Sequence, residues 1–192
     1  MPPERQLIRT VGGNPVPIAG VWEFDPGHTE VGFEGRHLMV TRVRGRFLRF
    51  SGRLSVAEVP EQSSAEIEIE VASLESGFAD RDAHLKSADF FDAARFPTIR
   101  FRSTALRHEA GDRWRADGDL TVRDVTRSVA LEVEFAGAQV DPWGNRKLGF
   151  VATGVINRED FGLTWNLALE AGGLLVGKEV RLQVAVEAAL QA

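Results

Sequence analysis

The side chains best suited to chemistry are concentrated in residues 78–103, FADRDAHLKSADFFDAARFPTIRFRS. Arg81, Asp82 and His84 have the residue types of a charge-relay set, and Asp82 with His84 could serve as general acid and base. No GxSxG element or other recognisable nucleophile context accompanies them. A structural role competes, because an aspartate suits a helix N-terminus and Arg81 with Asp82 could cap and pin the segment. We assign no catalytic residue and keep catalysis by Asp82 and His84 as an alternative.

The candidate metal ligands are the four histidines, His28, His37, His84 and His108, of a chain without cysteine. No HExxH or similar local pair is present, so the ligands would have to gather from distant strands. We expect neither a metal nor a cofactor. The competing interpretation of His28 and His37 is that they are partly buried and tie strand ends together through hydrogen bonds of their ring nitrogens.

The composition is that of one globular domain, with 192 residues of which 43% are hydrophobic and 27% charged. A formal charge of -5 argues against nucleic-acid binding, which requires clustered Lys and Arg. The absence of cysteine excludes disulfides, thiolate metal ligands and cysteine nucleophiles, and it leaves the redox compartment open.

The N-terminus and the hydropathy pattern bear on location. No run of about 18 apolar residues is present, so we predict no transmembrane helix and no stable membrane insertion. The first residues lack the apolar core of a secretory signal, which favours a cytoplasmic protein, or a periplasmic or secreted one if the chain is a processed form. The Gly and Pro content of residues 1–19 favours a flexible N-terminal extension, which leaves 20–192 as the folded domain.

Period-two alternation dominates from Val21 onward and predicts half-buried strands. In residues 64–73, SAEIEIEVAS, the larger apolar residues fall on one face and the glutamates on the other. In the strand that follows residues 30–37, the predicted inward set is Leu48, Phe50, Gly52 and Leu54. About eight such strands without long crossovers predict an all-β fold, a single antiparallel eight-stranded barrel. A two-sheet sandwich is the second choice.

Residues 80–96 interrupt this pattern. Leu85, Ala88 and Phe91 recur every three residues, which predicts a short helical segment across a barrel end. Pro97 would end the segment, since the residue before a proline avoids the helical region. We expect residues 38–44 to form a second short turn.

Three motifs in a fixed order carry a family resemblance. They are DPGHTEVGFEGRH at 25–37, the 78–103 stretch, and INREDFG at 156–162. Together they resemble the YceI-like family of polyisoprenoid-binding proteins, from about Gly20 to the C-terminus. The resemblance implies a lipocalin-like barrel that binds polyprenyl chains, such as those of isoprenoid quinones and polyprenyl phosphates. It also implies that His28 and His37, in the first motif, lie near the cavity.

The third motif supplies two further polar positions, Asn157 and Arg158. Arg158 could pair with a carboxylate such as Asp82 across the barrel mouth. The polar motif residues that we expect to be structural are His28, Arg81, Asp82, His84, Asn157 and Arg158.

The aromatic content favours a hollow apolar interior, because the chain has 12 Phe and no Tyr whose hydroxyl would need a partner. Inward phenylalanines alternate with glycine and alanine, which would leave room for a guest. We expect Phe90, Phe91 and Phe96 to close one end, and Phe161 and Trp165 to lie near the other. The predicted ligand-binding residues are Phe33, His37, Phe50, Ile69, Leu85, Phe90, Phe91, Phe101, Leu120, Phe150, Phe161 and Trp165.

We therefore expect non-catalytic binding or transport of a long-chain isoprenoid lipid, of the polyprenyl quinone or polyprenyl phosphate type. The alternatives are an enzyme acting on such a lipid through Asp82 and His84, and a filled-core barrel that functions as a homodimer. The arginines at 42, 44, 46, 49 and 53 either form a solvated strand face opposite Glu66, Glu68 and Glu70 or meet an acidic head group.

Overall fold

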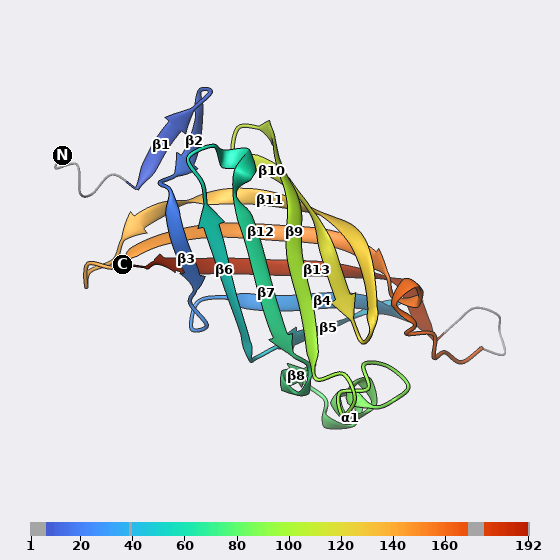
Figure 1. Cartoon of the computed structure of the whole chain (residues 1–192). Helices are drawn as coiled ribbons and strands as arrows, with labels where there is room; N and C mark the ends of the chain where they lie inside the picture. The colour runs from blue at the N-terminus through green and yellow to red at the C-terminus, as the bar shows by residue number, and fades with distance from the viewer. Residues whose placement is uncertain (1–6, 39, 169–174, 192) are drawn as a thin grey trace.

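The computed structural model describes residues 7–38, 40–168 and 175–191, and they form thirteen strands and one α-helix (Figure 1). The strands are β1 (Ile8–Val11), β2 (Asn14–Pro17), β3 (Gly20–Phe24), β4 (Glu30–His37), β5 (Thr41–Phe47), β6 (Phe50–Val56), β7 (Ser64–Glu70), β8 (Leu74–Glu75), β9 (Thr98–Ala110), β10 (Arg113–Val122), β11 (Val125–Val140), β12 (Arg146–Asn157) and β13 (Val176–Leu190). The helix is α1 (Ala79–Lys86), and the short 3-10 turns are η2 (Pro60–Gln62), η3 (Val71–Ser73) and η4 (Arg158–Phe161).

The main sheet is a closed antiparallel barrel with eight strand positions, because three positions each hold two consecutive strands: β3 with β4, β5 with β6, and β7 with β8. β3 and β4 pair with successive parts of β13, while β6 pairs with β3 and β5 pairs with β4. The order around the barrel is β3/β4, β5/β6, β7/β8, β9, β10, β11, β12 and β13. Pairing of β12 with β13 closes the ring, as the period-two pattern predicted.

The split position of β5 and β6 bends where the alternation of side chains breaks. Between β5 and β6, Phe47 is buried and Phe50 is half-buried, but Leu48 is 52% exposed. The prediction that Leu48 points inward is therefore wrong, because the chain shifts its register at 48–49. The expected turn at 38–44 is also shorter than predicted, since β5 already begins at Thr41.

Two apolar clusters divide the barrel interior. One end is filled by a cluster of buried side chains around Trp22, which is fully buried. Its other buried members are Val56, Leu148, Val186 and Ala188. The second cluster, which includes Phe47, Leu74, Phe90, Phe101 and Phe161, lies toward the end where α1 and η4 are found. Its members form a wall around open space.

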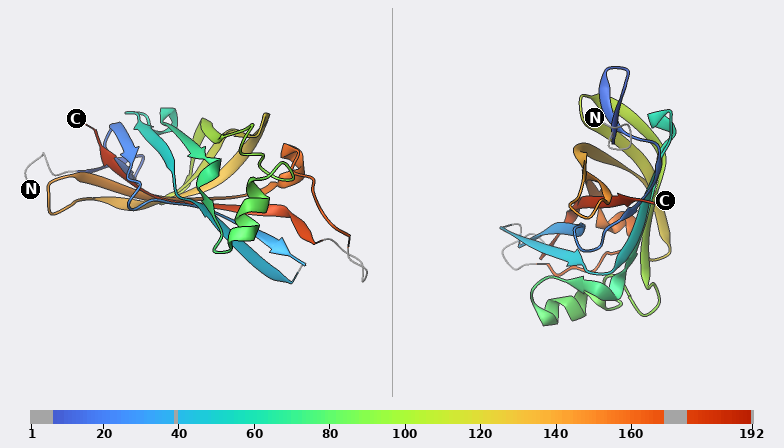
Figure 2. Two further views of the ribbon diagram at one scale, coloured as in Figure 1. Left: turned by 90° about the horizontal axis from the view of Figure 1, so that it is seen from below. Right: turned by 90° about the vertical axis from the view of Figure 1, so that its left-hand side faces the viewer.

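The N-terminal residues that the structure describes differ from the expected flexible extension. β1 and β2 form a hairpin in which Leu7 and Val16 are buried. Arg9 fastens it to the loop after β6 by donating to Ala57 O at 2.5 Å and to Glu58 Oε2 at 3.0 Å. Seen end-on, the hairpin and α1 lie at opposite edges of the barrel (Figure 2). The prediction of a loose segment was wrong for residues 7–17, because four-residue strands are too short to give a clear alternation.

The predicted helical segment is present and shorter than expected. α1 ends at Lys86, eleven residues before Pro97, so the proline does not end it. The end is local: Ser87 donates from its N to His84 O at 3.1 Å and from its Oγ to the same carbonyl at 2.7 Å. Turns occupy most of the chain from there to β9. Among the described residues, no helix is both long and apolar enough to cross a bilayer.

Candidate ligand cavity

A cavity of about 820 Å³ occupies the barrel interior beyond the Trp22 cluster. Its walls are mainly aliphatic and aromatic side chains that alternate inward from the strands, such as Val31, Ile67, Leu131, Leu182 and Val184. This volume lies within the range of roughly 300 to 1,000 Å³ that is usual for small-molecule sites. The barrel is therefore hollow over part of its length and filled over the rest.

The cavity opens between three segments. Its wall includes the exposed residues Arg36, Thr41 and Arg42 at the β4–β5 turn and Phe78 and Asp80 beside α1. Leu175 and Gly177, at the start of β13, complete the opening. We call this opening the mouth.

Eleven of the twelve predicted ligand-binding residues line this cavity. They are Phe33, His37, Ile69, Leu85, Phe90, Phe91, Phe101, Leu120, Phe150, Phe161 and Trp165. The exception is Phe50, which packs against the second cluster without lining the cavity. Among the residues that the sequence did not single out, Phe24 and Phe47 also line the cavity. Simple alternation from Phe50 does not predict that Phe47 points inward, because the register shifts at 48–49.

The aromatic residues at the α1 end form one group. The Trp165 ring lies 4.5 Å from His84 and 5.4 Å from Phe90, centroid to centroid. The prediction that Trp165 and Phe161 lie at the opposite end from Phe90 is therefore wrong, because the segment after β12 turns back toward α1. Phe96 does not line the cavity and lies beneath the guanidinium groups of Arg95 and Arg123, at 5.0 and 5.3 Å.

The inner end of the cavity is closed by Phe24 and Phe150, whose rings meet edge to face with centroids 5.8 Å apart. Both also pack on the Trp22 cluster. A guest entering from the mouth would thus reach an apolar floor with no side-chain hydroxyl.

Glycines keep the cavity open by letting rings lie flat on the sheet. A Cβ built at Gly45 would stand 2.7 Å from Cε1 of Phe33, and one at Gly118 would stand 2.6 Å from Arg102 O and closer still to the Phe101 ring. The sequence-based interpretation was that small residues leave room directly. In the structure, most of these glycines create space indirectly. The ring of a neighbouring phenylalanine packs flat over the glycine and so does not project into the cavity. Gly35 differs, because a Cβ there meets nothing within 4 Å.

Arg158 is buried, with 4% of its surface exposed, and its guanidinium binds backbone carbonyls. It donates to Gly177 O at 2.8 Å, Leu163 O at 2.5 Å and Trp165 O at 3.0 Å. Burial lowers its pKa from the usual value. The predicted pairing of Arg158 with a carboxylate is wrong. Instead, this cation holds the segment after η4 against β13, and its Cζ lies 5.8 Å from the centre of the Phe90 ring.

Arg81 and Asp82 pin α1 to Ser76, which lies three residues before the helix begins. Asp82 Oδ1 accepts from Ser76 N at 2.8 Å and from Ser76 Oγ, while Arg81 donates to Ser76 Oγ at 2.8 Å and Ser76 O at 2.7 Å. Neither is the N-cap of the helix, which is Phe78, a residue that makes no side-chain capping hydrogen bond. Asp82 does not line the cavity, and His84 is bonded through Nε2 to Asp89 Oδ2 at 2.9 Å. The pair is thus not arranged as a joint acid and base.

Asn157 has a structural role at the end of β12, where its Oδ1 accepts from Glu159 N at 3.0 Å and starts η4. His37 lines the cavity near its mouth, whereas His28, the other histidine of the first motif, does not.

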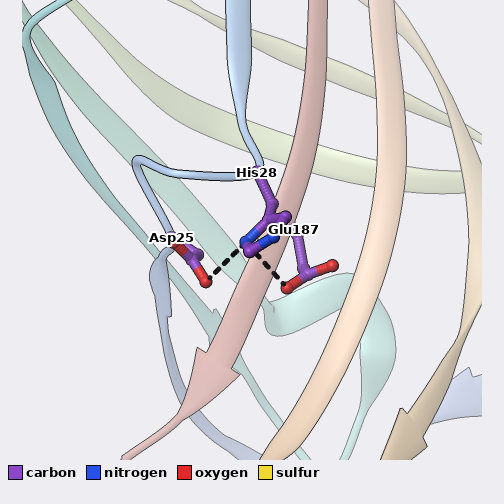
Figure 3. Close-up of side chains that lie close together, drawn as sticks. All are labelled: Asp25, His28 and Glu187. Atoms are coloured by element: carbon purple, nitrogen blue, oxygen red, sulfur yellow. Dashed lines mark hydrogen bonds and ion pairs between the residues drawn. The ribbon is translucent and has the colours of Figure 1, made fainter. Parts of the chain in front are cut away.

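His28 lies outside the barrel, which contradicts the expectation that it is partly buried near the cavity. Its Nδ1 is 3.1 Å from Asp25 Oδ2 and 3.6 Å from Glu187 Oε1, and its side chain is 68% exposed (Figure 3). The three groups have the types of metal ligands. However, Lys147 Nζ already contacts both carboxylates, at 2.5 and 3.1 Å. Its hydrogen bond to Asp25, with that of His28, lowers the pKa of Asp25 to about 2. This cluster fastens the β3–β4 bend to β12 and β13.

The strand-face arginines divide between the predicted glutamate row and other partners. Arg49 pairs with Glu70 and Arg53 with Glu66, each at 2.6 Å. Arg46 instead pairs with Glu75, and Arg42 and Arg44 share Glu34. Of this second group, Arg42 lines the cavity at its mouth.

Comparison with known proteins agrees with this architecture. A family model described as YceI-like domain matches residues 22–188. A UPF0312 protein of Staphylococcus aureus (strain N315) is 34% identical over 167 residues, covering 85% of this chain and 94% of that protein.

Two solved structures share the fold. BcnA of Burkholderia cenocepacia superposes with a TM-score of 0.75 at 22% identity, covering 85% of this chain and 98% of BcnA. A polyisoprenoid binding domain from Saccharophagus degradans, implicated in plant cell wall breakdown, superposes with a TM-score of 0.64 at 13% identity. That match covers 91% of this chain and 100% of the other.

Proposed function

This chain belongs to the YceI-like domain family, and on that premise we propose that it binds a long-chain isoprenoid lipid without chemically altering it. The lipid is of the polyprenyl quinone or polyprenyl phosphate type. Its tail lies in the barrel cavity and its head group remains at the mouth. The observation that carries the proposal is the apolar cavity itself, which extends from Phe24 and Phe150 to the mouth at α1.

The energetics favour a hydrocarbon guest. Each buried methylene contributes about 0.8 kcal/mol, so ten of them contribute about 8 kcal/mol before the cost of association is subtracted. The cavity wall offers few polar groups to the inner part of a guest. A tail can therefore supply most of the affinity, while the residues of the mouth supply any contact with the head group.

The chemistry of the walls supports binding without catalysis. The side chains that could act as acid and base are not paired with each other, since Asp82 lies off the cavity and binds Ser76, while His84 lines the cavity and binds Asp89. The solved Saccharophagus degradans domain of the same fold is described as polyisoprenoid-binding, which is consistent with the same guest class here.

Extraction of the purified protein with organic solvent, followed by mass analysis, tests the proposal. We expect a lipid with repeating isoprene units at close to one molecule per chain. Protein that is empty from several expression hosts, and that takes up no added polyprenyl quinone, would contradict it. Turnover of the lipid into a new product would contradict the non-catalytic part alone.

A further inference from the structure

Exposed apolar side chains surround the mouth of the cavity. Val40 is 84% exposed, Phe78 59% and Leu167 54%, and Leu38 at the β4–β5 turn is 40% exposed. They come from the β4–β5 turn, the residue before α1 and the segment after η4, and the turn and α1 lie toward the same end of the barrel (Figure 1). Leu38 N donates to Leu175 O at 2.8 Å, and Leu175 N donates to Leu167 O at 3.0 Å, which ties two of these segments together. Phe78 and Leu175 both line the cavity, so the exposed apolar group is continuous with its wall.

The backbone conformation of the β4–β5 turn indicates that Leu38 has a role beyond stabilising the fold. Leu38 has φ of 53°, in the left-handed region that glycine or asparagine adopts at lower cost. A bulky apolar side chain is thus held in a strained turn and left in contact with solvent. Observed strain of this kind is a reason to look for a function at that position.

Positive charge lies beside the apolar turn. On the outer faces of β4, β5 and β13, Arg36 stands directly opposite Arg42, and Glu34 stands opposite both Arg44 and Arg181. Glu34 binds Arg44 at 3.0 Å and Arg42 at 3.2 Å. Among the described residues, Arg36 has no hydrogen bond or ion pair from its side chain.

Three arginines, Arg42, Arg44 and Arg181, therefore act on the single carboxylate of Glu34, with Arg36 directly opposite Arg42, so positive groups outnumber negative ones on this face although the chain's formal charge is -5. Directly opposed like charges weaken a sheet, so this arrangement does not serve the barrel's stability. On the α1 side of the mouth, Arg81 and Asp80 offset each other.

We propose that the mouth docks on a bilayer surface that contains anionic lipid. Leu38, Val40 and Phe78 enter the headgroup region, and Arg36 with its neighbours meets lipid phosphates. The cavity then opens toward the bilayer, so a long-chain lipid passes between the two without crossing water. This inference rests on the proposed function, because docking gives the cavity access to its guest.

Vesicle co-sedimentation of the whole protein tests the docking. We expect binding to vesicles of equal parts phosphatidylglycerol and phosphatidylcholine, little binding to phosphatidylcholine alone, and weaker binding at high salt. Arg36→Glu and Arg42→Glu should each reduce partitioning at least about fivefold, and Val40→Asp should reduce it further. Trp143→Asp is the matched control, because Trp143 is also 84% exposed but lies in the β11–β12 turn at the other end of the barrel.

Absence of binding by the wild-type protein, or equal loss in Val40→Asp and Trp143→Asp, would overturn the docking proposal. Capture of a protein partner in place of vesicles would overturn it as well. Organic extraction of the same preparations keeps the two proposals separate. Protein that carries lipid but ignores vesicles refutes docking alone, whereas empty protein that also takes up no polyprenyl quinone from detergent micelles refutes lipid binding.

Discussion

The ring of Phe33 on β4 lies flat over Gly45 on β5, its direct partner across the strands. A methyl group at Gly45 would stand 2.7 Å from Cε1 of the ring, so the ring would have to swing into the cavity or the strands would have to separate. This pair shows how the barrel keeps a hollow interior although many aromatic side chains point inward.

Gly45→Ala is therefore expected to destabilise the protein by about 1 to 3 kcal/mol, the usual cost of overpacking. Urea unfolding followed by tryptophan fluorescence measures the change. Gly35→Ala is the matched control, since its Cβ enters open space. Similar stabilities for the two variants would show that Phe33 does not depend on Gly45.

Arg158→Met should cost about 3 kcal/mol or more, because it leaves several buried carbonyl groups without a donor. The same unfolding assay applies. Arg127→Met, which removes an exposed arginine bonded to its neighbour's carbonyl, should change the free energy of unfolding by less than about 0.5 kcal/mol. Equal effects of the two substitutions would argue against a structural role for Arg158.

Asp82→Ala distinguishes a structural aspartate from a catalytic one. We expect a loss of about 1 to 3 kcal/mol in stability, since Ser76 loses the acceptor for its N–H and hydroxyl, while folded protein still binds lipid. Asp80→Ala, in the same helix, serves as the control. Full stability of Asp82→Ala, together with loss of a lipid-converting activity, would favour the enzyme alternative.

The Asp25 cluster gives the protein a specific dependence on acid. Because the pKa of Asp25 is lowered to about 2 in the folded state, its stabilisation is present above its ordinary value near 3.8 and is lost as the pH falls toward 2. Asp25→Asn should lower stability by about 1 kcal/mol at neutral pH and make the loss between pH 4 and pH 2 less steep. Thermal melts of both proteins across this range provide the comparison. Parallel pH profiles would show that Lys147 and His28 do not stabilise the carboxylate.

Much of the barrel could be predicted because alternation survives wherever both faces of a strand have distinct partners. Ile67 and Ile69 face the interior, while Glu66 and Glu68 pair outward with arginines of neighbouring strands. β5 (Thr41–Phe47) was not recognised from this alternation, and a turn over 38–44 was predicted in its place. Its inward positions are Val43, Gly45 and Phe47, and a glycine in the middle breaks the apolar signal because its role depends on a ring from another strand.

The polar part of the candidate site was less predictable than its walls. Nothing local to INREDFG indicates that Arg158 serves backbone carbonyls, because its acceptors belong to segments 5 to 19 residues away. The position of Trp165 beside His84 likewise depends on how the chain turns after η4. His28 was placed near the cavity through the family resemblance, while its position in the bend between β3 and β4 puts it outside.

The most direct test of lipid binding is native mass spectrometry of the wild-type protein and Gly35→Leu after incubation with a polyprenyl quinone. The leucine would occupy open cavity space and displace about four methylene equivalents, or about 3 kcal/mol, which corresponds to roughly a hundredfold loss of affinity. Val155→Leu, on the outer face of β12, is the control. We predict a one-to-one adduct in the wild-type and control proteins and its loss in Gly35→Leu. No adduct in any protein, or an equal adduct in all three, would contradict a lipid held in the barrel.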